Sequence, residues 1–138
     1  MHELSLMEAV REQVLEQARR HGAHRIDVIT LRIGSLAGVE PEALQFACEV
    51  VMAGSIAANA RLQIEAVPAA AFCDRCQGEF ALGDGLWECP RCGGLSRQLR
   101  RGRELQLASL QLTSALPSLG SRRRSDVCRL RLQPAGPV

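Results

Sequence analysis

The sequence of 138 residues contains no Lys and no Tyr, and it has few aromatic residues of any kind. Its four aromatic side chains are Phe46, Phe72, Phe80 and Trp87, so the core has to be built mainly from aliphatic residues. So few aromatic residues also give the chain no surface on which nucleic-acid bases could stack. All 17 basic side chains are Arg, and we have no physical account of that preference.

The sequence also has no long apolar run. No stretch reaches the roughly 18–20 consecutive apolar residues that a membrane-spanning helix requires. Glu3, Glu8, Arg11 and Glu12 interrupt anything that resembles the apolar segment of a signal peptide. We therefore expect a cytoplasmic protein without membrane association. In that reducing compartment, six cysteines favour metal binding over disulfides.

The net charge of +2 is unevenly distributed along the chain. Residues 1–113 carry 12 Arg and 14 acidic residues, whereas residues 114–138 carry five Arg and one Asp. The basic excess therefore belongs to the C-terminal segment. The Pro, Gly, Ser and Arg content of residues 114–138 predicts an extension that is mostly disordered, although residues 127–132 alternate as an edge strand would.

Two Cys-x-x-Cys pairs, Cys73/Cys76 and Cys89/Cys92, are separated by twelve residues. Each pair lets two thiolates from one tight turn reach the same ion, and two facing turns complete a tetrahedral shell that suits Zn²⁺. Four protein ligands leave no open coordination position, so we expect a structural zinc in a ribbon over residues 69–97 and no enzyme. Of the other cysteines, we expect Cys48 to be a core residue and Cys128 a free thiol.

The apolar periodicity around this ribbon predicts an α+β fold. We expect helices over residues 5–21, capped by Ser5, and 41–54, and strands over 26–34, 61–66 and 104–113. Residues 1–68 and 98–113 then form a small domain with two helices and a roughly three-stranded sheet, into which the four-cysteine ribbon is inserted. The expected inner faces consist of Met7, Val10, Val14, Ala18, Ile29, Leu31, Ile33, Leu44, Ala47, Cys48, Val51, Leu62, Ile64 and Ala66.

The first three residues, Met1, His2 and Glu3, form a candidate metal site. Met1 should be retained because His2 is bulky. The α-amine, the backbone amide nitrogens and the His2 imidazole could then close adjacent chelate rings on one ion. Such planar nitrogen donors suit Ni²⁺ or Cu²⁺ better than Zn²⁺. The alternative is an ordinary surface histidine, which we also expect for His21 and His24.

Taken together, these features resemble the HypA/HybF family of hydrogenase nickel-incorporation proteins. The resemblance covers residues 1–113 and is carried by four stretches in order: MHELSL, LRIGSLAGVEPEALQFACEVV, the double Cys-x-x-Cys motif and GRELQLASL. It implies a nickel metallochaperone that binds Ni²⁺ at Met1, His2 and Glu3, with structural zinc at Cys73, Cys76, Cys89 and Cys92. The implied partners are a HypB-type GTPase and the large subunit of [NiFe]-hydrogenase, and in some members the urease maturation factors.

A zinc-ribbon module that binds nucleic acid is the alternative function. It is favoured by arginines in and after the ribbon and by the run Arg122-Arg123-Arg124. The acidic balance of residues 1–113 and the scarcity of aromatic residues count against it. The ribbon arginines are Arg75, Arg91, Arg97, Arg100, Arg101 and Arg103.

Overall fold

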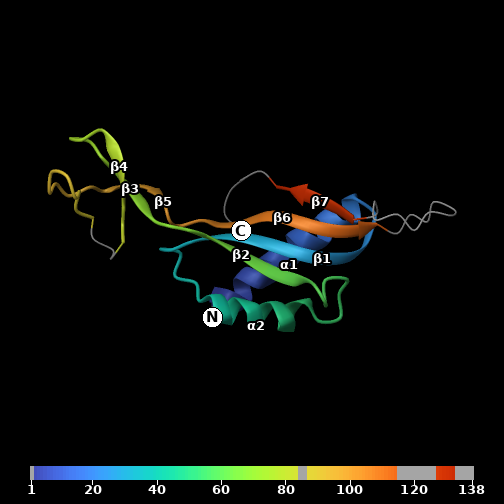
Figure 1. Cartoon of the computed structure of the whole chain (residues 1–138). Coiled ribbons are helices and arrows are strands. Elements are labelled where there is room, and N and C mark those ends of the chain that lie inside the picture. The colour runs from blue at the N-terminus through green and yellow to red at the C-terminus, as the bar shows by residue number, and fades with distance from the viewer. Residues whose placement is uncertain (1, 84–86, 115–126, 133–138) are drawn as a thin grey trace. The chain divides into compact units, whose positions relative to one another are not determined.

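A computed structural model describes residues 2–83, 87–114 and 127–132 (Figure 1). The chain divides into two compact units. The helical unit comprises Met1–Leu31, Val39–Ile64 and Gln106–Val138, and the ribbon unit comprises Arg32–Gly38 and Glu65–Leu105. Neither helix in the described residues is long and apolar enough to cross a membrane.

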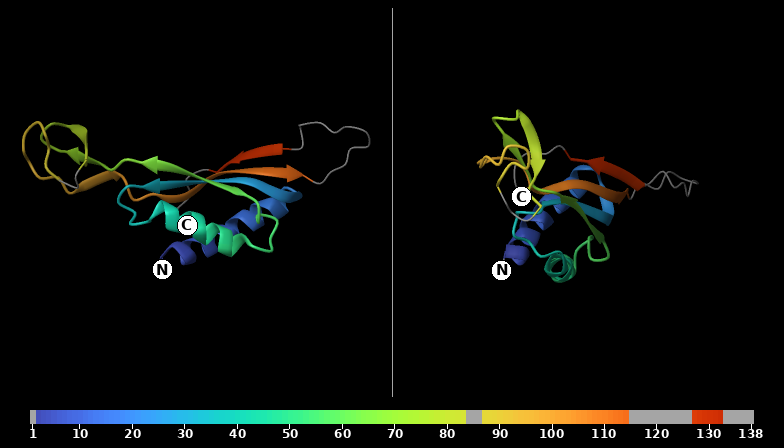
Figure 2. Two further views of the ribbon diagram at one scale, coloured as in Figure 1. Left: turned by 60° about the horizontal axis from the view of Figure 1, so that its bottom comes forward. Right: turned by 60° about the vertical axis from the view of Figure 1, so that its left-hand side comes forward.

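The larger sheet has the strand order β2-β1-β6-β7, formed by β1 (Ala23–Gly34), β2 (Arg61–Val67), β6 (Leu105–Ser114) and β7 (Val127–Arg131). Helices α1 (His2–Arg20) and α2 (Pro41–Met52) lie on the same face of this sheet (Figures 1 and 2). Strand β7 pairs antiparallel with β6 from Ser109↔Arg131 to Thr113↔Val127. The α+β class is confirmed, and the edge strand expected near residues 127–132 is present as a fourth strand. The disorder expected for the rest of the extension falls on residues outside the described ranges.

Helix α1 buries the side chains that its periodicity indicated. Met7, Val10, Val14 and Ala18 are all completely buried. The predicted start at Ser5 is wrong, because the helix already begins at His2. Two features favour the earlier start: Glu3 places a negative charge in the first turn, and its carboxylate accepts a hydrogen bond from the backbone amide of Glu40 at 3.4 Å.

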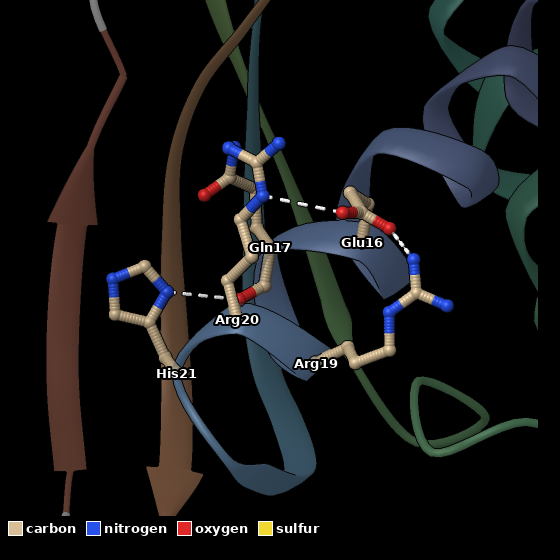
Figure 3. A network of polar contacts seen from close by, with 5 residues as sticks. All are labelled: Glu16, Gln17, Arg19, Arg20 and His21. Carbon is tan, nitrogen blue, oxygen red and sulfur yellow. Dashed lines mark hydrogen bonds and ion pairs between the residues drawn. The ribbon is translucent and has the colours of Figure 1, made fainter.

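Polar contacts stabilise the C-terminal end of α1 (Figure 3). The His21 ring donates Nδ1–H to the carbonyl oxygen of Gln17 at 2.9 Å, and Glu16 pairs with both Arg19 and Arg20. Gly22 follows with φ of 62°, the left-handed conformation that commonly ends a helix. Both His21 and His24 are exposed, as expected, and His21 in addition caps the end of the helix.

Most, but not all, of the residues that were expected on inner faces are buried. Ile29, Leu31, Ile33, Leu44, Ala47, Cys48 and Leu62 are buried. On α2, Met52 is buried, whereas Val51 is only half-buried. The assignment of Ala66 to an inner face is wrong, because it is exposed, and Ile64 is half-buried. Polar and apolar residues alternate along β2 as far as residue 66, but burial on the inner face decreases from Leu62 through Ile64 to Ala66.

The ribbon unit contains a smaller sheet of order β4-β3-β5, formed by β3 (Ala70–Cys73), β4 (Gly78–Ala81) and β5 (Gln98–Arg101). Strand β3 pairs antiparallel with both neighbours. A small core holds the unit together, and two of its members are cysteines. It consists of Ala69, Ala71, Cys73, Phe80, Leu82 and Cys89, with Cys76, Trp87 and Leu99 packed against it.

Three segments of the ribbon unit cross at very close range. Gly34 faces the carbonyl group of Gly102, and a side chain at Gly34 would overlap that group. Gly102, with φ of 127°, lies against Ala69. The amide of Leu36 donates to the Gly102 carbonyl at 2.6 Å, and the amide of Ala69 donates to Ser35 Oγ at 3.0 Å. Glycine is required here because only backbone fits between the segments.

Candidate metal centres

The four cysteines of the double motif converge on one point in the ribbon unit. Cys73 ends β3 and Cys76 lies in the turn before β4, while Cys89 and Cys92 come from the second turn. All four sulfur atoms lie within 4.8 Å of one another. The sequence spacing predicted this convergence correctly.

The sulfur geometry fits a tetrahedral zinc ion. The Sγ atoms of Cys73 and Cys92 are 3.6 Å apart, and those of Cys76 and Cys89 are 3.8 Å apart. Zinc–sulfur bonds of about 2.3 Å in a regular tetrahedron place sulfur atoms about 3.8 Å apart. A disulfide would bring them to about 2.05 Å, and Cys73, Cys76, Cys89 and Cys92 are all free thiols.

Backbone conformation in the two turns brings each pair of thiols to the same side. In the second turn Gly93 has φ of 71°, and its amide donates to the Cys89 carbonyl at 2.8 Å. In the first turn the left-handed residue is Gln77, with φ of 52°. In both turns the left-handed residue directly follows the second cysteine of the pair.

The local environment shifts the pKa values of two of the thiols in opposite directions. Hydrogen bonds from the backbone amides of Cys92 and Arg91 lower the pKa of Cys89 to about 7. A side-chain hydrogen bond with Cys92, followed by desolvation, raises the pKa of Cys76 to about 12. Cys89 therefore carries a thiolate at mildly alkaline pH, whereas Cys76 needs a metal ion to displace its proton.

Two arginines lie inside the Cys-x-x-Cys turns, Arg75 in the first and Arg91 in the second. The Gly78 position faces the Arg91 guanidinium, and the Gly94 position faces both Cys92 Sγ and the Arg75 side chain. Two further ribbon arginines have partners, since Arg101 pairs with Glu79 at 2.7 Å and Arg100 lies 4.4 Å from the Phe72 ring centroid. Arg101 and Arg100 thus interact within the ribbon unit, which removes part of the case for a nucleic-acid surface.

At the chain start, the structure brings together residues that are distant in sequence. His2 opens α1, and Glu3 in the same turn contacts the backbone amide of Glu40, which is the N-cap residue of α2. Met1 and the His2 side chain lie outside what the structure describes. The contact between Glu3 and Glu40 was not predicted, because 37 residues separate them and no local pattern encodes the pairing.

Cys48 lies on the inner face of α2 and is buried, as expected. Burial, with a smaller contribution from the charge of Glu49, raises the pKa of its thiol. It takes no part in the four-cysteine cluster. The side chain of Cys128, expected to be a free thiol, is outside the described part of the chain.

The chain is similar to known proteins over most of its length. Residues 1–112 match the family model described as "Hydrogenase/urease nickel incorporation, metallochaperone, hypA". Hydrogenase maturation factor HypA from Cereibacter sphaeroides is 45% identical over 112 residues, which cover 81% of this chain and 99% of the relative. The HypA of a Picosynechococcus strain is 40% identical over the same coverage.

Solved structures agree with this similarity. The solution structure of the Ni metallochaperone HypA from Helicobacter pylori has a TM-score of 0.59 at 22% identity, covering 81% of this chain and 97% of the other, and shows a common fold. A second solution structure, titled as HypA protein, has the same TM-score at 25% identity and covers 96% of its chain. The matched length ends near the C-terminus of β6, so β7 lies beyond it.

Proposed function

Because this chain belongs to the HypA family of nickel-incorporation metallochaperones, we propose that it binds Ni²⁺ at Met1, His2 and Glu3 and delivers the ion during maturation of [NiFe]-hydrogenase. The cargo is transferred without covalent chemistry. The proposed partners are a HypB-type GTPase and the hydrogenase large subunit, with urease maturation as a second destination. The proposed compartment is the cytoplasm, where thiols stay reduced.

The observation that carries the nickel proposal is the start of α1 at His2. A helix leaves the N–H groups of its first turn without acceptors inside the helix. Metal ligation by backbone nitrogens in this turn therefore breaks no helical hydrogen bond. The positive end of the helix dipole also favours the negative charge that develops on an amide nitrogen when a metal ion displaces its proton into the solvent. The rest of α1 then holds the ligating residues in a fixed geometry.

We propose that Cys73, Cys76, Cys89 and Cys92 hold a structural Zn²⁺. The sulfur spacing supports this assignment, and a closed shell of four thiolates leaves no position for a reacting molecule. The ion would supply folding free energy to a unit whose apolar core is small. Nickel cargo and structural zinc would thus use different donor sets, nitrogen-rich at the chain start and all-sulfur in the ribbon.

The nickel proposal is tested by replacing the imidazole. His2→Ala should abolish the nickel equivalent seen by isothermal titration calorimetry while leaving the zinc content and the circular dichroism spectrum unchanged. His24→Ala is the matched control, because His24 is an exposed histidine on β1. The proposal fails if His2→Ala binds nickel as the wild type does, or if His24→Ala loses nickel equally.

A second arm of the same titration tests the chain end itself. A Gly-Ser dipeptide placed before Met1 moves the α-amine away while keeping every side chain. Nickel affinity should fall, and the absorption band of planar nickel should disappear. An unchanged band would show that the α-amine is not a ligand.

A further inference from the structure

Helix α2 has an outward face with an unusual composition. Two large apolar side chains on it are strongly exposed, Phe46 at 67% and Val50 at 52% of their surface. They lie one turn apart, at positions i and i+4, so they form one continuous patch. The exposed residues of this outward face are Glu42, Phe46, Glu49 and Val50.

This patch does not contribute to folding. The opposite face of α2 already supplies the core with Leu44, Ala47, Cys48 and Met52. The other three aromatic residues, Phe72, Phe80 and Trp87, are half-buried or buried in the ribbon unit. Phe46 is therefore the one of the four aromatic side chains that is mainly exposed, and exposed aromatic anchors are typical of protein interfaces.

The charge around the patch restricts what can bind there. No Arg occurs between Arg32 and Arg61 in a chain that has 17 of them, while Glu40, Glu42 and Glu49 all fall in that interval. Glu42 and Glu49 flank Phe46 at one helical turn on either side. A second copy of this face would repel the first, and an anionic membrane would repel it as well. A complementary surface has an apolar groove bordered by Arg or Lys.

We propose that the outward face of α2 docks into an apolar, positively rimmed groove of a protein that exchanges nickel with this chain. The inference rests on the proposed nickel function. Its location supports it: the backbone amide of Glu40, immediately before α2, contacts Glu3 at 3.4 Å. Phe46 lies six residues further, or about 9 Å along the helix axis. A protein that grips Phe46 is thereby held close to the candidate nickel residues.

The test measures binding of the full chain to the HypB-type GTPase and to the hydrogenase large-subunit precursor of the same organism, all free of nickel. Phe46→Ala should weaken binding to at least one of them by about tenfold or more, because truncation of an interface anchor commonly costs that much. The matched control is Leu95→Ala, since Leu95 is an apolar side chain that is 83% exposed on the ribbon unit. It should leave the affinities within about twofold.

Several results would overturn the proposal. These are a smaller effect of Phe46→Ala on both partners, an equal loss with Leu95→Ala, or no binding of the wild type to either protein at about 100 µM. Loss of a wild-type dimer on Phe46→Ala, seen by sedimentation, would instead assign the face to a second copy. Nickel titration of Phe46→Ala should match the wild type. Failure of nickel binding in the wild type would refute the nickel function without affecting the docking measurement.

Charge reversal gives an independent readout of the same contact. Glu42→Arg with Glu49→Arg should slow association and reverse the salt dependence of the association rate, because the flanking charges steer the encounter. An association rate that does not respond to either the double substitution or salt contradicts the charged rim.

Discussion

At the scale of single residues, Gly34 shows how little space the ribbon unit leaves where its segments cross. A Cβ atom at this position would overlap the Gly102 carbonyl group and lie 2.5 Å from the Arg103 amide nitrogen. Since all these neighbours are backbone atoms, none can rotate away. Gly34→Ala should lower the free energy of unfolding by about 2 kcal/mol or more, in line with overpacked cores, measured by urea denaturation.

The control for that measurement is Gly83→Ala. Gly83 has no neighbour within 4 Å of an added Cβ and no left-handed backbone, so its substitution should change stability by less than about 0.5 kcal/mol. Equal stability of the two variants would mean that the segments at Gly34 separate easily, contrary to the close crossing.

The residues that sequence predicted well are those whose role follows from local spacing. Cys73 and Cys76 form one turn, and Met7, Val10 and Val14 repeat with the helical period, so neighbours along the chain define their positions. Gly34 and Gly102 gave no such signal, because each is required by a partner far away in sequence. The contact of Glu3 with Glu40 was missed for the same reason.

At the scale of elements, β7 occupies an edge of the larger sheet that lies beyond the length matched by the family. Its five registered pairs run from Ser109↔Arg131 to Thr113↔Val127. Truncation after Ser114 would leave the β6 edge unpaired. We expect a loss on the order of 2 kcal/mol in unfolding free energy, measured by thermal denaturation, and greater self-association, because an exposed edge can pair with another chain.

A second truncation, after Leu132, keeps β7 and removes only the residues that follow it. It should behave as the full chain in both measurements. If removing β7 changed neither stability nor self-association, the pairing with β6 would contribute nothing to the fold.

Element boundaries were predicted less well than element types. Both helices and the strands β1, β2 and β6 were expected, but α1 begins at His2 and not at Ser5. A Ser followed by Glu three residues later is a good local cap signal, yet the tertiary contact of Glu3 with the N-cap residue of α2 extends the helix beyond it. The small sheet of the ribbon unit has strands of four residues, too short for alternation to define.

At the scale of the whole molecule, two compact units with separate proposed metal sites should respond differently to metal removal. The ribbon core includes Cys73 and Cys89 among its six buried members, so removal of the proposed zinc would take away a central support of this core. A chelator at pH 6 should unfold the ribbon unit while α1 and α2 stay folded. In residue-resolved amide spectra, loss of chemical-shift dispersion should be confined to residues 70–101.

The sign of the pH effect follows from the thiols. A lowered pKa favours the thiolate, so Cys89 is ready for zinc above about pH 7 and gains a competing proton as the pH falls through that value. Zinc affinity should therefore fall more steeply below about pH 7, by one further factor of ten per pH unit. Competition with a chromogenic chelator from pH 8 to 6 measures the slope. In the chelator experiment, ribbon amide signals that keep their chemical-shift dispersion after zinc removal would contradict a structural role of zinc.

Cys48 adds a consequence that concerns metal selectivity. A protein that carries nickel past its own thiols risks losing the cargo to a sulfur ligand, and Cys48 sits on α2, the helix whose first residues adjoin the chain start. Its burial to 5% exposure, together with the raised pKa of its thiol, keeps the sulfur protonated and out of reach. The packing of the helical unit thus keeps the Cys48 thiol from competing for the nickel ion.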